Sequence, residues 1–343
     1  MKKIIFLLIS ALLFVSCREK NSVSTDVTAD LSNENKKVIG LSIDTLAIER
    51  WQRDLDIFIN KAKELGADVI VQNAGNSCEE QSRQILYLYE KNVDCVVIVP
   101  KDAEKLVDVV ARLKSKKIPV ISYDRLILNA DIDLYLTIDS ERVGELMAEG
   151  ILNITDARKW FCMLGPREDF NMTLIKSGID KVIKHENVYI GYTFYTDGWN
   201  YDLAYTGMVN ILNEGNFPDA IICGNDAVAN SVVKALNLYY SGPHIPICGQ
   251  DADITSCQYI VKGIQDFTIY KPISKLAETA AEYAVELANG GHPEIPASQH
   301  RTINNGYAEI SGLWLDPIRV DKSNIDEVII NSGFHSYSAV YGK

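Results

Sequence analysis

Short apolar segments alternate with longer amphipathic segments from residue 38 to about residue 270. Apolar runs of about four to eight residues are typical of strands buried on both faces, and apolar residues spaced three and four apart are typical of helices. Their alternation predicts parallel sheets with helices on both faces. The predicted strands are residues 38–44, 68–74, 94–100, 119–123, 134–139, 160–164, 188–194, 220–224, 245–249 and 266–270.

Amphipathic segments between these strands predict the helices. They are residues 50–65, 77–91, 103–117, 140–153, 170–185, 200–214, 226–240 and 253–262. Pro272–Gly290 is a further long, Ala-rich helical pattern, and two short strand-like stretches follow at 305–310 and 314–320. A chain of 343 residues exceeds the about 250–300 residues over which a single core grows, so two domains are expected.

The tail beyond the long helix is too short for a third domain, so it must pack on the two halves. The chain then crosses between them near Ser140, near Pro272 and near residue 310, and such crossings form a hinge. We expect an α/β protein with two doubly wound parallel-sheet lobes. The expected lobes are residues 38–139 plus 273–308 and residues 140–272 plus 309–343.

A targeting pattern occupies the amino end. Two lysines precede an apolar run from Ile4 to Val15, which is shorter than the about 20 residues needed to span a membrane. This layout is typical of a secretory signal. The small residue before Cys17 resembles the lipobox of bacterial lipoproteins, although Phe14 stands where Leu is usual. We expect residues 1–17 to be a lipoprotein signal with the lipid on Cys17; a cleaved, unanchored form is the alternative.

Residues 18–37 are polar and without periodicity, which predicts a flexible tether. The whole chain has 46 acidic and 34 basic residues, a formal charge of −12, and loss of residues 1–16 removes two more lysines. An acidic chain without a basic cluster does not suit nucleic acid.

Seven cysteines are present, and six of them follow the signal. Four lie inside strand-like runs, where a free cysteine behaves as a small hydrophobic residue: Cys95, Cys162, Cys223 and Cys248. None has the spacing of metal ligands, so no metal or cofactor is expected. A disulfide stays open, with Cys223 and a cysteine of a neighbouring strand as the pair to test.

Polar residues follow the predicted strands in both halves. They are Asp44, Asp124-Arg125, Asn225-Asp226, Gln250-Asp251-Ala252-Asp253 and Lys271. Open α/β sheets bind ligands at the carboxyl ends of their strands. Capping of the next helix is the alternative for Asp44, Asp226 and Asp253, and a structural ion pair is the alternative for Asp124-Arg125.

Two tryptophans join these positions. Glu49-Arg50-Trp51-Gln52 follows the first predicted strand, and Thr196-Asp197-Gly198-Trp199 follows strand 188–194. Charged and amide groups bind hydroxyls that both donate and accept, while indole faces suit C–H groups. The combination predicts a sugar site better than an amino-acid or phosphate site.

Several of these segments resemble the periplasmic sugar-binding proteins related to the ribose- and galactose-binding proteins. The matching segments are IGLSIDTLAIERWQRDLDIF, YDRLILNADIDLYLTIDSERVGELMA, TDGW, GNDAVAN, GQDADI, IYKPISKLAETAAEYAVELANG and NIDEVIINSGFH. The similarity runs from about residue 38 to the end, and ERWQRD, YDR…NADID and GQDAD are specific to the xylose-type subgroup.

The resemblance implies the type I periplasmic binding protein fold and a monosaccharide, D-xylose or another pentose, bound between closing lobes. It also implies a monomer in the periplasm or at the cell surface that delivers its sugar to an ABC permease. Presentation of the sugar to a membrane histidine kinase is the alternative. The ligand-binding positions that it implies are Arg50, Trp51, Asp124, Arg125, Asn171, Trp199, Asn225, Asp251 and Lys271.

Two departures from the family pattern affect the expected site. Thr45 stands where the family has a second acidic residue, and in LGPREDFN the first Asn of the family's run before Asn171 is lost or displaced while Phe170 intrudes. These changes leave the identity of the pentose open.

Catalysis and DNA binding are not expected. The five histidines lie outside the strand ends, and neither a phosphate loop nor a G-x-S-x-G turn is present. Paired carboxylates could support glycoside hydrolysis, but a guanidinium and an ammonium beside them suit stable binding better. Sugar-responsive repressors of this fold carry a helix-turn-helix headpiece, whose place is taken here by the signal and tether.

Overall fold

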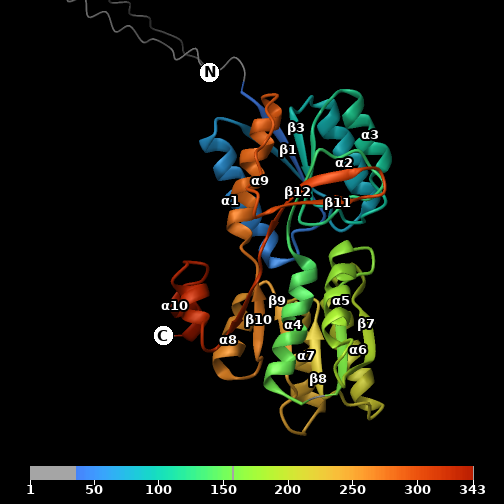
Figure 1. Ribbon diagram of the computed structural model, residues 1–343, viewed down its shortest axis with the longest axis vertical. Helices are drawn as coiled ribbons and strands as arrows, with labels where there is room; N and C mark the ends of the chain where they lie inside the picture. The colour runs from blue at the N-terminus through green and yellow to red at the C-terminus, as the bar shows by residue number, and fades with distance from the viewer. Residues whose placement is uncertain (1–35, 157, 343) are drawn as a thin grey trace, which may run out of the picture. The chain divides into compact units, whose positions relative to one another are not determined.

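Two sheets, each covered by helices on both faces, form the part of the computed structural model that is described, residues 36–156 and 158–342 (Figure 1). The first sheet has seven strands in the order β11-β12-β5-β4-β3-β1-β2, and the second has six in the order β13-β10-β9-β8-β6-β7. We call each sheet with its helices a lobe. The predicted signal and most of the predicted tether lie outside the described residues.

The strands of the first lobe are β1 (Val38–Ile43), β2 (Asp68–Asn73), β3 (Cys95–Ile98), β4 (Val120–Tyr123), β5 (Leu134–Ile138), β11 (His300–Asn304) and β12 (Glu309–Leu315). Those of the second lobe are β6 (Lys159–Leu164), β7 (Tyr189–Tyr195), β8 (Ala220–Cys223), β9 (Ile247–Gln250), β10 (Phe267–Tyr270) and β13 (Ile318–Asp321). The ten strands predicted by apolar runs are all present, and neighbours among them pair in parallel.

The helices are α1 (Glu49–Glu64), α2 (Cys78–Glu90), α3 (Val107–Ser115), α4 (Ser140–Ile154), α5 (Phe170–Ile183), α6 (Tyr201–Asn213), α7 (Asp226–Tyr239), α8 (Ile254–Lys262), α9 (Ile273–Ala288) and α10 (Tyr337–Tyr341). A 3-10 turn at Asp197–Trp199 and a π turn at Asp326–Ile330 complete the elements. Among the described helices, none is long and apolar enough to cross a membrane.

The core lies between the sheets and their helices. All four residues of β3 are fully buried, as expected for a central strand covered on both faces. Helix α9 follows β10 of the second lobe but packs beside α1 on the first sheet (Figure 1). The chain therefore returns to the first lobe through α9.

The third crossing lies later than predicted. Strand β12 pairs with β5 in the first sheet, and β13 pairs with β10 in the second, so the chain crosses at Asp316 and Pro317. The expected crossing near residue 310, and the lobe boundary between residues 308 and 309, were therefore wrong by one strand. Pro317 cannot donate to a sheet ladder, which ends the pairing at this point.

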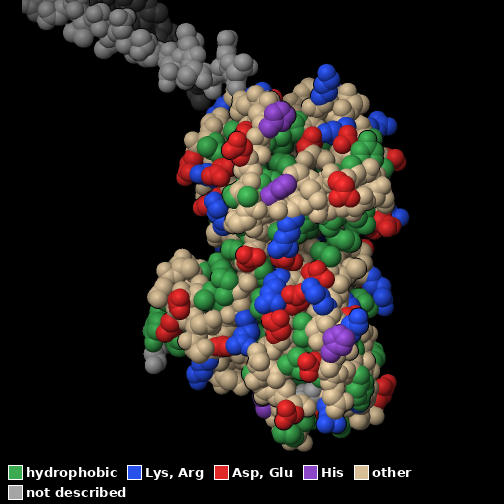
Figure 2. All heavy atoms as spheres, in the orientation of Figure 1, with side chains coloured by type: hydrophobic (Ala, Val, Ile, Leu, Met, Phe, Trp, Pro, Cys, Tyr) green, Lys and Arg blue, Asp and Glu red, His purple; other side chains and the backbone are tan. Residues whose placement is uncertain are grey.

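Described acidic and basic side chains are interspersed on the face shown in Figure 2. A mixed surface of this kind does not supply the continuous positive potential that phosphate backbones require.

Candidate ligand-binding site

One pocket between the two sheets is lined by all nine residues that the sequence singled out. Four of them come from the first lobe, four from the second, and Lys271 comes from a crossing. The complete lining is Ile48, Arg50, Trp51, Asp124, Arg125, Asp169, Asn171, Met172, Trp199, Asn225, Gln250, Asp251 and Lys271. The strands end at this pocket, so polar residues that are distant in the sequence meet there.

Arg50 lies in the first turn of α1 and is buried among carboxylates. Its Nη2 is 2.8 Å from Asp124 Oδ2 and donates to Asp54 Oδ1 at 3.3 Å. The Tyr123 hydroxyl donates to the same oxygen of Asp54. Burial opposes the charge of Arg50, but the carboxylates, Asp124 first, hold its pKa above the usual value. Arg50 is therefore a fixed cation that can donate to a ligand oxygen.

Arg125 joins the two lobes. Its Nη1 donates to Asp44 Oδ2 at 2.5 Å and to the carbonyl of Pro100 at 3.2 Å, both in the first lobe. Its Nε lies 2.7 Å from Asp169 Oδ2 in the second lobe. Burial raises the pKa of Asp169, and the Arg125 charge opposes that rise. The guanidinium thus holds two buried carboxylates that belong to different lobes.

Asn171 and Trp199 form the wall of the second lobe. The Asn171 amide donates to Asp124 Oδ1 at 2.9 Å, and Trp199 Nε1 donates to Asp169 Oδ2 at 3.3 Å. A Cβ on Gly165 would lie 2.3 Å from the Trp199 ring, so only glycine lets the indole lie against this loop. The tryptophan face is therefore positioned by close backbone packing.

Asp251 and Lys271 complete the wall. The Lys271 ammonium is 2.7 Å from Asp251 Oδ1, and Arg50 Nη1 is 3.9 Å from the same oxygen. The Asn225 amide donates to the Tyr201 hydroxyl at 3.4 Å. This corner therefore presents a carboxylate, an ammonium and an amide together.

Four buried polar atoms of the lining have no hydrogen-bond partner among the described residues: Arg50 Nε, Trp51 Nε1, Asn171 Oδ1 and Asp251 Oδ1, the last of which is in ion-pair contact with Lys271. Buried polar groups nearly always have a partner, so these atoms can serve a ligand with hydroxyls. The cavity volume is about 20 Å³, room for about one water molecule, because the side chains pair directly with one another. A ligand with several hydroxyls must replace some of these direct pairs.

Helix capping does not account for the strand-end acids. Asp44 bonds to a guanidinium, and Asp226 accepts from the hydroxyl of Thr268 on β10 at 2.9 Å. Asp253 stands at the N-cap of α8 but makes no side-chain cap hydrogen bond. Asn225 does cap α7 through its Oδ1, while its amide nitrogen donates to the Tyr201 hydroxyl.

The ligand-binding positions expected from the sequence did not include Asp169. Phe170 was expected to affect the site, and this expectation was wrong. Asp169 caps α5 and lines the pocket, and its position shortly after strand β6 was the signal that could have found it. Phe170 does not line the pocket, because its ring packs against the apolar cluster of the first lobe. Thr45 also lies outside the lining, and its hydroxyl accepts from the Ala47 N–H at 3.1 Å.

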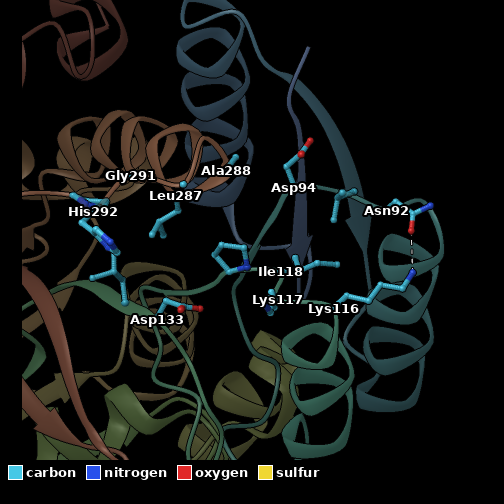
Figure 3. Close-up of a pocket in the computed structure, with 15 residues that line it drawn as sticks. Asn92, Asp94, Lys116, Lys117, Ile118, Asp133, Leu287, Ala288, Gly291 and His292 are labelled. Carbon is cyan, nitrogen blue, oxygen red and sulfur yellow. Dashed lines mark hydrogen bonds between the residues drawn. The ribbon is translucent and has the colours of Figure 1, made fainter. Parts of the chain in front are cut away.

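A larger pocket, of about 700 Å³, lies at the amino-terminal ends of strands β3, β4 and β5 in the first sheet (Figure 3). It contains none of the predicted ligand residues, and the Lys116 ammonium there donates to Asn92 Oδ1 at 2.9 Å. Its basic side chains are exposed and its acidic ones are already paired, as Asp133 is with Lys114. Size alone therefore does not identify the ligand site.

The described cysteines, including Cys223 and Cys248 on neighbouring strands, are free. Burial raises the pKa of both thiols, so they are inert core residues. Within residues 36–156 and 158–342, no group of three or more His, Cys, Asp or Glu side chains could hold a metal ion.

Known proteins resemble this chain along most of its length. The model of the periplasmic binding protein domain matches residues 39–292. The chain is 41% identical to the D-xylose-binding periplasmic protein of Haemophilus influenzae over 308 residues, 88% of this chain and 92% of that protein. It is 40% identical to the protein of the same name from Escherichia coli over 305 residues, 88% of this chain and 91% of that protein.

A solved structure shows the same arrangement. The solute-binding protein of an ABC transporter from Clostridium phytofermentans, with bound β-D-glucose, has a TM-score of 0.82 and 26% identity, and the match covers 89% of this chain and all of that one. These relatives are solute-binding proteins, which confirms the prediction that the chain is not an enzyme. With two doubly wound lobes around one polar pocket, the chain belongs to the periplasmic binding protein family and has its type I fold.

Proposed function

We propose that this protein binds a monosaccharide, D-xylose or another pentose, between its two lobes and delivers it to an ABC permease without chemical change. The observation that carries the proposal is the convergence of charged groups from both lobes on one pocket with two tryptophans. Arg50, Asp124 and Asp251 can each bind a hydroxyl, and charge-assisted hydrogen bonds are about twice as strong as neutral ones.

The relatives support the choice of ligand. Two proteins at 41% and 40% identity are named for D-xylose, and the ERWQRD segment that is typical of the xylose-type subgroup begins at the pocket. The direct pairs across the pocket also explain why the lobes must move. A sugar enters only when the lobes part, and it favours closure because it binds both walls.

Calorimetry with a panel of aldopentoses and aldohexoses tests the proposal. We expect one sugar to bind per chain, with D-xylose among the tightest, and the sugar to be recovered unchanged. Binding of a hexose in preference to every pentose would correct the ligand but keep the function. No heat with any monosaccharide would refute the sugar site.

The partner is proposed as an ABC permease, with a membrane histidine kinase as the alternative left by the sequence. Both would recognise the closed, sugar-loaded lobes. Deletion of the gene distinguishes them, because a permease partner predicts loss of pentose uptake. A sensor partner predicts normal uptake and loss of the transcriptional response to the pentose.

We further propose that the protein is anchored through a lipid on Cys17, on the evidence of the apolar run that ends in Ser16-Cys17. Replacing Cys17 by Ala should move the protein from the membrane fraction to the released fraction. Mass spectrometry of the purified amino-terminal peptide should show acylation of the native chain. An unmodified amino terminus at another residue, or unchanged fractionation of the variant, would contradict the anchor.

A further inference from the structure

The loop between β6 and α5 touches both lobes. Within it, Arg167 lies over the Tyr195 ring at 3.6 Å, and Asp169 caps α5 by accepting from the Asn171 N–H at 3.0 Å. These contacts fix the loop to the second lobe. Asp169 lines the pocket, but its neighbours Glu168 and Phe170 contact the first lobe outside the pocket.

Glu168 forms an ion pair with Lys101 of the first lobe. The Lys101 ammonium donates to Glu168 Oε1 at 2.7 Å, and the Lys101 side chain is only 9% exposed. The Lys101 backbone N–H is held by Gln81 Oε1 at 2.8 Å, and Gln81 is fully buried. Burial opposes the charge of Glu168, but the hydrogen bond from Lys101 holds its pKa below the usual value. The pair is thus fixed on both sides and partly shielded from water.

Phe170 adds an apolar contact beside this ion pair. It packs against the first-lobe cluster that includes Leu106, Leu126 and Ile127. Among the described apolar residues that form this cluster or pack against it, Phe170 is the only one from the second lobe. Phe170 therefore supplies an apolar contact between the lobes.

We propose that Lys101, Glu168 and Phe170 form a clasp that holds the lobes closed and thereby sets the affinity and release rate of the sugar. The proposal rests on the proposed function. None of the three residues lines the pocket, so the clasp acts through the closing equilibrium rather than through the sugar. The apparent dissociation constant rises as the binding-competent fraction falls, so losing contacts made only in the closed form weakens binding.

Three single variants test the clasp: Phe170→Asn, Glu168→Gln and Lys101→Met. Affinity for D-xylose is measured by calorimetry, and release by stopped-flow tryptophan fluorescence. We expect each variant to bind D-xylose about tenfold more weakly, which corresponds to a loss of about 1.4 kcal/mol of binding free energy. The loss should appear as faster release. Small-angle scattering of the sugar-free variants should give a larger radius of gyration than that of the sugar-free native protein.

The double variant with Lys101→Met and Glu168→Gln tests whether the two residues affect sugar affinity through one ion pair or independently of each other. It should bind no more weakly than the worse single variant, because residues that act through one contact are not additive. Two losses that add in full would overturn the pairing.

Asp180→Asn is the matched control. It breaks an exposed ion pair within helix α5, in which the Lys176 ammonium lies 2.5 Å from Asp180 Oδ1. It should leave D-xylose affinity, release and scattering unchanged. The clasp is overturned if its own variants behave like this control, or if they lower only the melting temperature. If the native protein binds no sugar, the proposed function fails, and the sugar-free scattering profiles still decide the clasp: a larger radius in the variants supports it, and an equal radius overturns it.

Discussion

Replacing Asp251 by Asn or Ala should reduce D-xylose affinity by about 30-fold or more. Asp251 is buried directly after β9, and its Oδ1 lies 2.7 Å from the Lys271 ammonium and 3.9 Å from Arg50 Nη1. Without the carboxylate, both cations stay buried without this partner, and the loss of a buried charged partner costs about 2–5 kcal/mol of binding energy. At 1.4 kcal/mol per decade, that loss is about 30-fold to several thousandfold.

The Asn variant is the more informative of the two. Asp251 has φ 98°, a region that β-carbon-bearing residues rarely adopt and that Asn tolerates better than Ala. Asp251→Asn therefore removes the charge with less backbone strain. Calorimetry measures affinity and circular dichroism the melting temperature. Near-native affinity in a folded Asn variant would mean that the pocket is misassigned.

Trp199→Ala complements this test by removing an apolar face instead of a charge. The indole lies against the backbone of Gly165 and donates to Asp169, so its loss removes both a packing surface and a donor from the pocket. We expect a loss of the same order as for Asp251. The variant should also lose the Trp199 part of the fluorescence change on binding and keep the Trp51 part, whereas Asp251→Asn should keep the whole change at saturating sugar.

The sequence predicted most of the residues that line the candidate pocket because parallel strands share a direction. Once Asp124, Asn225 and Asp251 were recognised as strand-end residues, their convergence followed from the sheet geometry. The pattern could not say which residue pairs with which. Asp124 and Arg125 are adjacent in the sequence, yet Asp124 pairs with Arg50, and Arg125 pairs with Asp44 and Asp169.

The errors have physical causes as well. Strand β11 (His300–Asn304) is an edge strand with mostly exposed residues, so it has no apolar run to reveal it. Phe170 was expected to intrude into the pocket because an aromatic residue replaced a polar one in the family pattern. Its ring instead found an apolar surface on the other lobe, a contact that depends on how the lobes meet.

Replacing Arg125 by Met should be the most damaging single change, because it affects both folding and closure. Arg125 is 3% exposed and bonds to Asp44 at 2.5 Å and to Asp169 at 2.7 Å. Removing one partner of a buried ion pair costs about 3–5 kcal/mol, because the other charge is left without compensation. We expect sugar affinity to fall by about 100-fold or more, at 1.4 kcal/mol per decade, together with a lower free energy of unfolding.

Measurements at different pH values test this cause. Burial already raises the pKa of Asp169, and loss of the Arg125 charge should raise it further. A carboxyl whose pKa is higher in the folded state destabilises the fold above that pKa, and the effect disappears as the pH falls toward the ordinary value of about 4. The stability deficit of Arg125→Met against the native protein should therefore shrink between pH 7 and about 4.

Urea unfolding at several pH values measures that deficit, and Arg142→Met is the control. Arg142 pairs with Glu149 on the exposed side of α4, and its side chain is 38% exposed, so its loss should cost little at any pH. Arg125→Lys should lie between native and Met, because an ammonium keeps the charge but cannot bond two carboxylates through a planar fork. A deficit for Arg125→Met that is small, or constant from pH 7 to about 4, would show that the Arg125 charge does not stabilise Asp169.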